Sequence, residues 1–141
     1  FFKQKGGNLS KDVFEQIYHL FNGHTWYIQC IMNRLYETEL TIDCIEQVNA
    51  ALLSILQGRE PQFENLVQFF TENQFSLLKA IAKDSIVVQP TSGKFLKEHK
   101  LSGASSVKAA LKALEDKELV YRTNEGYIIY DRFMDLWLKR I

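Results

Sequence analysis

Residues 91–130 read TSGKFLKEHKLSGASSVKAALKALEDKELVYRTNEGYIIY, and this stretch decides the predicted fold. Ser92 can cap a short helix that runs to about His99, and the Leu-Ser-Gly run at residues 101–103 ends it. A second helix is then predicted over residues 105–117. Its apolar residues recur at the spacing that places them on one side of a helix. These residues are Val107, Ala110, Leu111 and Leu114.

Two short apolar runs follow the second helix. Residues 118–122 and 127–130 flank Thr123-Asn124-Glu125-Gly126, whose Asn and Gly suit the positive-φ positions of a hairpin turn. Helix, turn, helix and hairpin in this order are the layout of a winged helix-turn-helix. Such a unit docks on DNA or on another protein and carries no chemistry of its own.

Amphipathic helices are also predicted before this stretch. Short connections between the first three favour an antiparallel bundle. Trp26 and Tyr27 are expected in the core of that bundle, because large aromatic side chains on a helical stripe are usually buried. The predicted ranges are residues 11–21, 25–38 and 42–57, with Ser10 and Thr41 as N-caps of the first and third, and with Gly58 ending the third.

Three further helices complete the expected architecture. The one over residues 72–83 is the natural first helix of the winged unit. We therefore predict a helical domain in residues 1–60 and a winged helix-turn-helix domain with a C-terminal helix in residues 61–141. The predicted fold class is mainly α with a small β wing. The three helices cover residues 62–70 after Pro61, residues 72–83 after Thr71, and residues 132–140 after Asp131.

The charge of the chain is balanced overall but uneven along its length. The 141 residues hold 17 basic and 17 acidic side chains and are 46% hydrophobic, which is enough for a buried core. Residues 1–90 hold 7 Lys or Arg against 10 Asp or Glu, whereas residues 91–141 hold 10 against 7. This difference is compatible with a nucleic-acid footprint but does not demand one.

The sequence patterns of several function classes are missing. No glycine-rich loop is followed by the Lys and Ser or Thr that hold nucleotide phosphates, and Gly93-Lys94 is continued by Phe95. Cys30 and Cys44, like the three histidines, do not stand at metal-ligand spacing, so no metal site is expected. We expect the chain itself to be no catalyst. Without an apolar run of roughly 18 to 20 residues or a signal segment, a cytoplasmic protein with no membrane partner is predicted.

Three stretches of the sequence resemble prokaryotic AAA+ ATPases of the archaeal, STAND-related type. They are FNGHTWYIQ at residues 21–29, LSGASSVKAALKAL at residues 101–114, and the ending GYIIYDRFMDLWLKR at residues 126–140. In that family a P-loop core comes first, then a helical lid and then a winged helix. The resemblance implies that this chain is the lid and winged part of a longer ATPase. The parent would bind ATP and Mg²⁺, this fragment would hold no cofactor, and the missing N-terminal core would be a partner.

Three functions remain open at this stage. The chain could be the regulatory lid and winged helix of an ATPase that engages duplex DNA or a protein, the DNA-binding module of a transcription regulator, or an interaction scaffold without nucleic acid. The exposed face of the second helix lacks the Arg, Asn and Gln that read base edges, so its polar residues are expected to hold the phosphate backbone. The candidate DNA- or partner-binding residues are Ser105, Lys108, Lys112, Lys94, Lys97 and Arg122.

Overall fold

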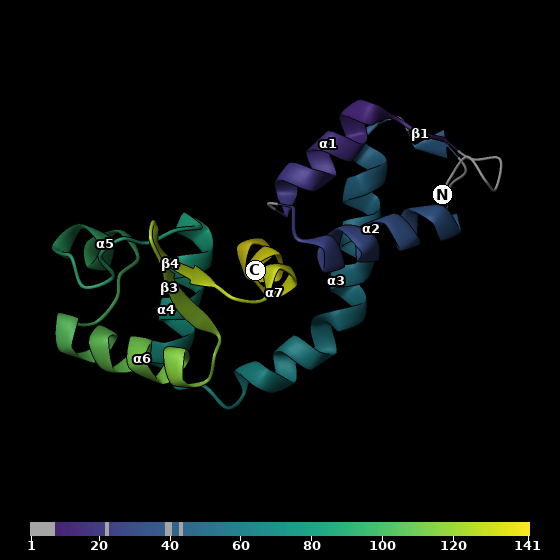
Figure 1. Cartoon of the computed structure of the whole chain (residues 1–141). Coiled ribbons are helices and arrows are strands. Elements are labelled where there is room, and N and C mark those ends of the chain that lie inside the picture. The colour runs from purple at the N-terminus through teal and green to yellow at the C-terminus, as the bar shows by residue number, and fades with distance from the viewer. Residues whose placement is uncertain (1–7, 22, 39–40, 43) are drawn as a thin grey trace. The chain divides into compact units, whose positions relative to one another are not determined.

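The computed structural model describes residues 8–21, 23–38, 41–42 and 44–141. These residues form seven helices and two small sheets, in the order shown in Figure 1. The predicted fold class, mainly α with a small β wing, is confirmed. The chain divides into two compact units, one ending at Gly58 and the other beginning at Arg59. Each unit is described separately.

The first unit contains a short parallel strand pair and three helical segments. Strands β1 (Asn8–Leu9) and β2 (Thr41–Ile42) pair in parallel. Helices α1 (Lys11–Leu20), α2 (Thr25–Thr38) and the first part of α3 (Ile45–Val67) supply the core. Its most deeply buried side chains are Val13, Ile17, Phe21, Ile31, Leu35, Ile42, Val48 and Leu56.

Helix α3 begins three residues later than the sequence predicted. Thr41 is not an N-cap, because Thr41 and Ile42 form β2, and the amide of Ser10 donates to the Ile42 carbonyl (2.7 Å). The side chain of Gln47 organises the helix start instead. Its Oε1 accepts from the Cys44 amide (3.3 Å), and its Nε2 donates to the Thr41 carbonyl (2.9 Å). Strand pairing thus takes the residues that were expected to open the helix.

Helix α1 lies close to its predicted range, but its cap differs from the simplest expectation. Ser10 occupies the N-cap position with an extended backbone and makes no side-chain capping bond. The pair Asn22-Gly23 is typical of a helix end, and Asn22 lies outside the described residues. Gly23 has a φ of +75°, and its amide donates to the Tyr18 carbonyl (2.9 Å). A glycine is favoured there because L side chains rarely adopt this positive φ.

The expected burial of the two aromatic residues at the start of α2 is wrong for Trp26, and Tyr27 is only half-buried. Tyr27 stacks on the buried Phe21, with ring centroids 5.4 Å apart, but the Trp26 side chain is 59% exposed. The buried face of α2 is defined by Ile31 and Leu35. Trp26 lies five residues before Ile31, which turns it about 140° from that face. Tyr27, four residues before Ile31, stays near it.

Residues 45–67 form one helix, although two were predicted on either side of Gly58 and Pro61. Gly58 lacks the positive φ of a helix-ending glycine, so it does not stop the helix. Pro61 removes only the hydrogen bond to the Gln57 carbonyl, and Gln57 is exposed to water. Residues on both sides of the proline also contact α7 (Arg132–Arg140): Arg59 and Glu60 precede it, and Phe63 follows it.

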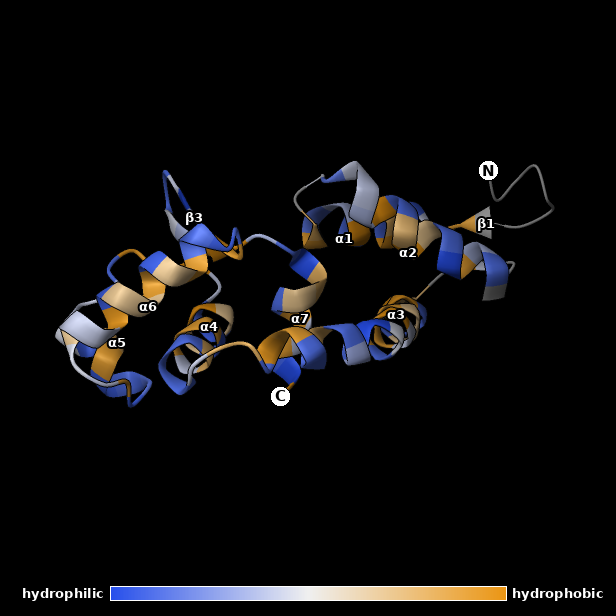
Figure 2. Cartoon of the chain, turned by 90° about the horizontal axis from the view of Figure 1, so that it is seen from below, coloured by the Kyte–Doolittle hydropathy of each residue, from blue (hydrophilic) through white to orange (hydrophobic). Residues whose placement is uncertain are grey.

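The second unit is built around helix α4 (Glu72–Asp84), which packs against α6 (Ala104–Asp116), α7 and β4 (Gly126–Ile129). The predicted apolar face of α6 is buried, and Figure 2 shows hydrophobic and hydrophilic residues alternating along this helix. The core of the unit is formed by Leu77, Leu78, Ile81, Val107, Leu114, Val120, Ile129, Phe133 and Leu138.

Three predicted helix caps in this unit are confirmed. Thr71 and Gln74 form a reciprocal capping box at the start of α4. At the start of α5 (Gly93–Glu98), Ser92 Oγ accepts from the Phe95 amide (3.3 Å). Asp131 Oδ1 accepts from two amides at the start of α7, at 2.9 and 3.2 Å. Each cap satisfies amides that a helix end leaves without partners.

The predicted hairpin is also confirmed. Strands β3 (Val120–Thr123) and β4 pair antiparallel, from Val120 opposite Ile129 to Thr123 opposite Gly126. Thr123 Oγ1 stabilises the turn by accepting from the Glu125 and Gly126 amides, each at 3.2 Å. Gly126 has a φ of +140°, whereas Asn124 does not take a positive φ.

The segment before α5 joins the hairpin as a third extended piece. Val87 exchanges two backbone hydrogen bonds with Tyr127, at 3.0 and 2.8 Å. This close approach also explains Gly126, since a Cβ there would lie 2.7 Å from the Val87 carbonyl oxygen. The short apolar run at residues 86–88 is compatible by sequence with either a strand or a linker. They form a one-residue bridge to β4.

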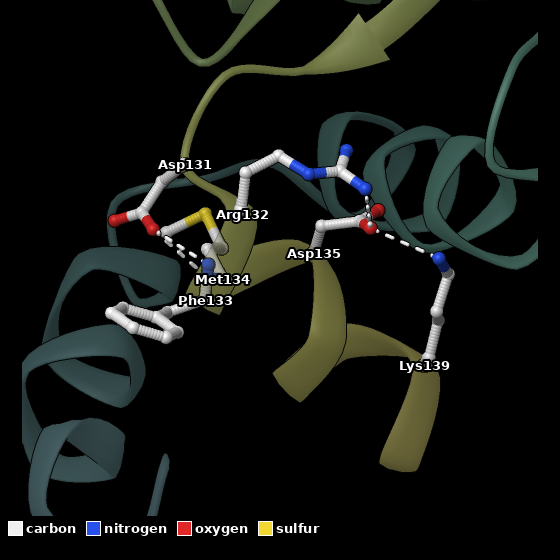
Figure 3. Close-up of polar contacts among 6 residues, drawn as sticks. All are labelled: Asp131, Arg132, Phe133, Met134, Asp135 and Lys139. Atoms are coloured by element: carbon white, nitrogen blue, oxygen red, sulfur yellow. Dashed lines mark hydrogen bonds and ion pairs between the residues drawn. The ribbon is translucent and has the colours of Figure 1, made fainter. Parts of the chain in front are cut away.

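Helix α7 holds the end of α3 through charged and aromatic contacts. Arg59 lies 3.2 Å from Asp131 Oδ2, and Trp137 Nε1 donates to Glu60 Oε1 (3.3 Å). On α7 itself the fully buried Asp135 carboxylate lies 3.0 Å from Lys139 Nζ and 3.6 Å from an Arg132 nitrogen (Figure 3). The two cations come from the same helix, one turn before and one turn after the acid.

Candidate nucleic-acid interface

The exposed face of α6 carries three of the six candidate residues. Ser105, Lys108 and Lys112 are all exposed, while Val107 and Leu111 on the opposite face are buried. Lys112 Nζ lies 3.6 Å from Asp116 Oδ2, and both side chains are mostly exposed. A pair of this kind contributes little free energy, so Lys112 can leave it for another anion.

A groove of about 560 Å³ lies between α6, the hairpin and the segment that leads into α5. Lys108 enters it from α6 and Arg122 from β3, although these residues are far apart in the sequence. The Arg122 guanidinium lies 6.0 Å from the centre of the Tyr127 ring. The groove therefore joins two cations with an aromatic face and hydroxyl groups. Its lining residues are Val88, Gln89, Pro90, Thr91, Ser92, Lys108, Leu111, Arg122 and Tyr127.

The remaining candidates lie outside this groove. Lys94, on α5, lines a neighbouring groove of about 390 Å³, and Ser92 belongs to both grooves. Lys97 on α5 is exposed and lines neither groove. Ser105 and Lys112 on α6 are also exposed and line neither groove. The structure thus brings Lys108 and Arg122 together, places Lys94 next to them, and leaves the other three as separate surface groups.

Sequence reasoning missed the aromatic and amide groups of the groove. Tyr127 lies directly opposite Arg122 in the hairpin register, so pairing the two strands around the predicted turn could have found it. Gln89 and Thr91 precede α5, and their place in the groove depends on the bridge between Val87 and Tyr127. No pattern in the sequence predicts that bridge.

Acidic residues bound this surface at one end. Glu115, Asp116 and Glu118 are exposed at the end of α6 and just after it, and Glu125 is exposed at the hairpin turn. A polyanion is therefore favoured along the first part of α6 and the groove, and is repelled at the far end of the helix. The exposed groups of the candidate residues are lysine ammonium, arginine guanidinium and serine hydroxyl groups. These groups can bind phosphate.

One comparison with known families decides the identity of the second unit. A family model described as a "probable winged helix domain" matches residues 61–140, more than half of the chain. The chain belongs to this winged helix family. In the winged helix domain α4, α5 and α6 are the three helices and β3–β4 is the wing, which confirms the winged part of the sequence interpretation. No curated protein and no solved structure was found to match the chain.

Within the part of the chain that the structure describes, no helix combines the length and the apolar character that crossing a bilayer requires.

Proposed function

We propose that this winged helix domain binds duplex DNA, mainly through the phosphate backbone and with α6 as the helix presented to the DNA. One observation carries the proposal: Lys108 and Arg122, from different elements, line one groove between that helix and the wing. Helix-turn-helix domains place their second helix in the major groove, where flanking basic groups contact phosphates.

The composition of the α6 surface supports backbone binding over base reading. Apart from the acidic Glu115 and Asp116 near its end, its exposed polar residues are Ser105, Lys108 and Lys112. The side chains best suited to bidentate contacts with guanine or adenine edges are Arg, Asn and Gln, and α6 contains none of them. We therefore expect similar affinities for unrelated sequences and a strong dependence on salt.

The expected salt dependence follows from the number of cations. Five basic candidates could each neutralise one phosphate, namely Lys94, Lys97, Lys108, Lys112 and Arg122. If all five do so, the slope of log K against log salt is about −4.5. Fluorescence anisotropy with two duplexes of unrelated sequence, at several salt concentrations, measures both the slope and the sequence preference.

Paired variants make this test specific to the groove. The double variant Lys108→Gln with Arg122→Gln should weaken binding and flatten the slope by about 2, because two phosphate contacts are lost. Lys11→Gln with Arg140→Gln removes the same charge from exposed positions that line neither groove, and it should change the slope much less. An absence of binding at low salt would reject DNA and leave a protein partner.

A second proposal concerns the first unit: we propose that it is the lid of an AAA+ ATPase whose P-loop core binds ATP and Mg²⁺. The support is the resemblance at residues 21–29, whose aromatic residues gather at the junction of α1 and α2. Phe21 stacks on Tyr27, and the His24 ring meets Tyr27 edge-on at 6.1 Å. These ring contacts provide a packing role for the aromatic residues of the short motif.

The parent gene product tests this second proposal. It should contain a P-loop before the first residue of this chain, and the purified full-length protein should hydrolyse ATP in the presence of Mg²⁺. The chain alone should not. A parent sequence without a P-loop would reject the ATPase proposal and leave the DNA proposal untouched.

A further inference from the structure

Three potential metal ligands meet where two helices of the winged helix domain end. Asp84 is the last residue of α4, Glu98 is the last residue of α5, and His99 follows it. One ligand atom from each residue lies within 4.8 Å of the others. His99 Nε2 is 3.0 Å from Asp84 Oδ1. Residue spacing did not predict this group, because Asp84 comes from a different helix.

The histidine is held in place at this point. Its side chain is 15% exposed, and its ring lies against the buried Phe95, with centroids 4.7 Å apart. The Nε2 atom is buried and, despite its distance of 3.0 Å from Asp84, makes no hydrogen bond of acceptable geometry. A buried polar atom without a hydrogen bond is unfavourable, and a metal ion at this nitrogen would satisfy it.

We propose that Asp84, Glu98 and His99 bind a divalent transition-metal ion, and that Zn²⁺ fits best. One imidazole and two carboxylates are ligands that zinc accepts, and three protein ligands leave a fourth position for water. The ligand atoms of tetrahedral zinc lie about 3.4 Å apart, given bonds of about 2.1 Å. The three ligand atoms lie within 4.8 Å of one another, so the two carboxylates, which belong to exposed residues, would rotate inward to reach that spacing.

Neighbouring cations limit the expected affinity. Lys79, Lys83 and Lys100 line a pocket together with Glu98 and His99. Lys79 Nζ lies 4.9 Å from the centre of the Phe75 ring, which provides it with a local partner. The remaining positive charge opposes a divalent ion, so binding should be weaker than at a closed site of four protein ligands.

Metal binding would join the ends of α4 and α5. These two helices precede α6, and α5 carries Lys94 and Lys97. An ion at this point would therefore hold the first two helices of the winged helix domain together and raise its thermal stability. This site does not depend on DNA binding, and its test contains no DNA.

Imidazole ¹⁵N NMR of the full 141-residue chain tests the proposal with Zn²⁺ alone. The His99 Nε2 signal should shift on zinc addition and return with EDTA, while the signals of the exposed His19 and His24 stay in place. Asp84→Asn and Glu98→Gln should each weaken zinc binding at least about tenfold, since even loss of an outer-shell partner has that effect. His19→Ala is the matched control and should leave binding unchanged.

Three results would overturn the metal site. The His99 Nε2 signal could stay in place on zinc addition, which would leave its contact with Asp84 as a simple ion pair. Zinc affinity could persist in the Asp84→Asn, Glu98→Gln double variant. Binding of Co²⁺ could produce thiolate absorption, which would assign the metal to Cys30 or Cys44. The NMR result on the unmodified chain decides the first point, even if a variant folds poorly.

Discussion

Asp135 illustrates how a single side chain contributes to this fold. Its carboxylate is fully buried on α7, and Lys139 and Arg132 approach it from the same helix (Figure 3). Burial of an isolated carboxylate is strongly unfavourable, and two nearby cations offset that penalty. The buried negative charge of Asp135 is therefore stabilised by the cations three residues before it and four residues after it.

Replacement of Asp135 by Ala should lower the free energy of unfolding by about 3 kcal/mol, because it leaves two partly buried cations without their anion. Urea unfolding monitored by circular dichroism measures this change. Asp116→Ala is a matched control, since Asp116 also pairs with a lysine four residues away but is exposed. It should cost less than about 0.5 kcal/mol. Equal effects would show that burial does not set the strength of the Asp135 interactions.

Gly126 is the residue at which backbone conformation and close packing coincide. Gly126→Ala should destabilise the winged helix domain by about 2 kcal/mol, because its φ of +140° is strained for alanine and the new Cβ meets the Val87 carbonyl. Gly93→Ala, in α5 with open space around it, should be nearly neutral. Thermal unfolding of both variants makes the comparison. A neutral Gly126→Ala would contradict the bridge to Val87.

At the scale of helices, the two tryptophans occupy opposite environments. Trp137 on α7 is buried against Phe63, with ring centroids 5.3 Å apart, whereas Trp26 on α2 is 59% exposed. The position of Trp26 on a helical stripe predicted burial for it as well. On α7, Trp137 is buried together with Phe133 and Leu138, whereas α2 buries Ile31 and Leu35 and leaves Trp26 outside its buried face.

Fluorescence distinguishes these two helix environments. In Trp26→Phe the remaining Trp137 should emit at shorter wavelength and resist quenching by acrylamide. In Trp137→Phe the remaining Trp26 should emit at longer wavelength and be readily quenched. Similar quenching in the two variants would show that α2 buries Trp26 after all.

At the scale of the whole molecule, the chain consists of two compact units, and the matched winged helix family covers most of the second. The core of that unit comes from residues within it, including Leu77, Ile81, Leu114, Phe133 and Leu138. Even the end of α3 that belongs to it is held by α7 through Phe63 and Trp137.

A fragment of residues 59–141 should therefore fold without the rest of the chain. It should show helical circular dichroism and a single cooperative thermal transition, because its buried side chains contact one another. If DNA binds through the groove of Lys108 and Arg122, the fragment should also keep the salt slope of the full chain. A fragment that stays unfolded would show that the first unit supplies essential contacts.

Local patterns in the sequence specified the helices and hairpin of the winged helix domain. The caps at Thr71, Ser92 and Asp131, the apolar stripe of α6 and the turn before Gly126 depend on residues within about one helical turn or one hairpin of each other. Such short-range interactions form whatever the remainder of the chain does. They were predictable for that reason.

Contacts between distant residues settled everything else. The continuity of α3 through Gly58 and Pro61, the pairing of β1 with β2 and the exposure of Trp26 depend on which elements become neighbours. So do the groove that joins Lys108 to Arg122 and the meeting of Asp84 with His99. Residue spacing along one helix or strand carries no information about the partner that packs against it, and packing brings these groups together.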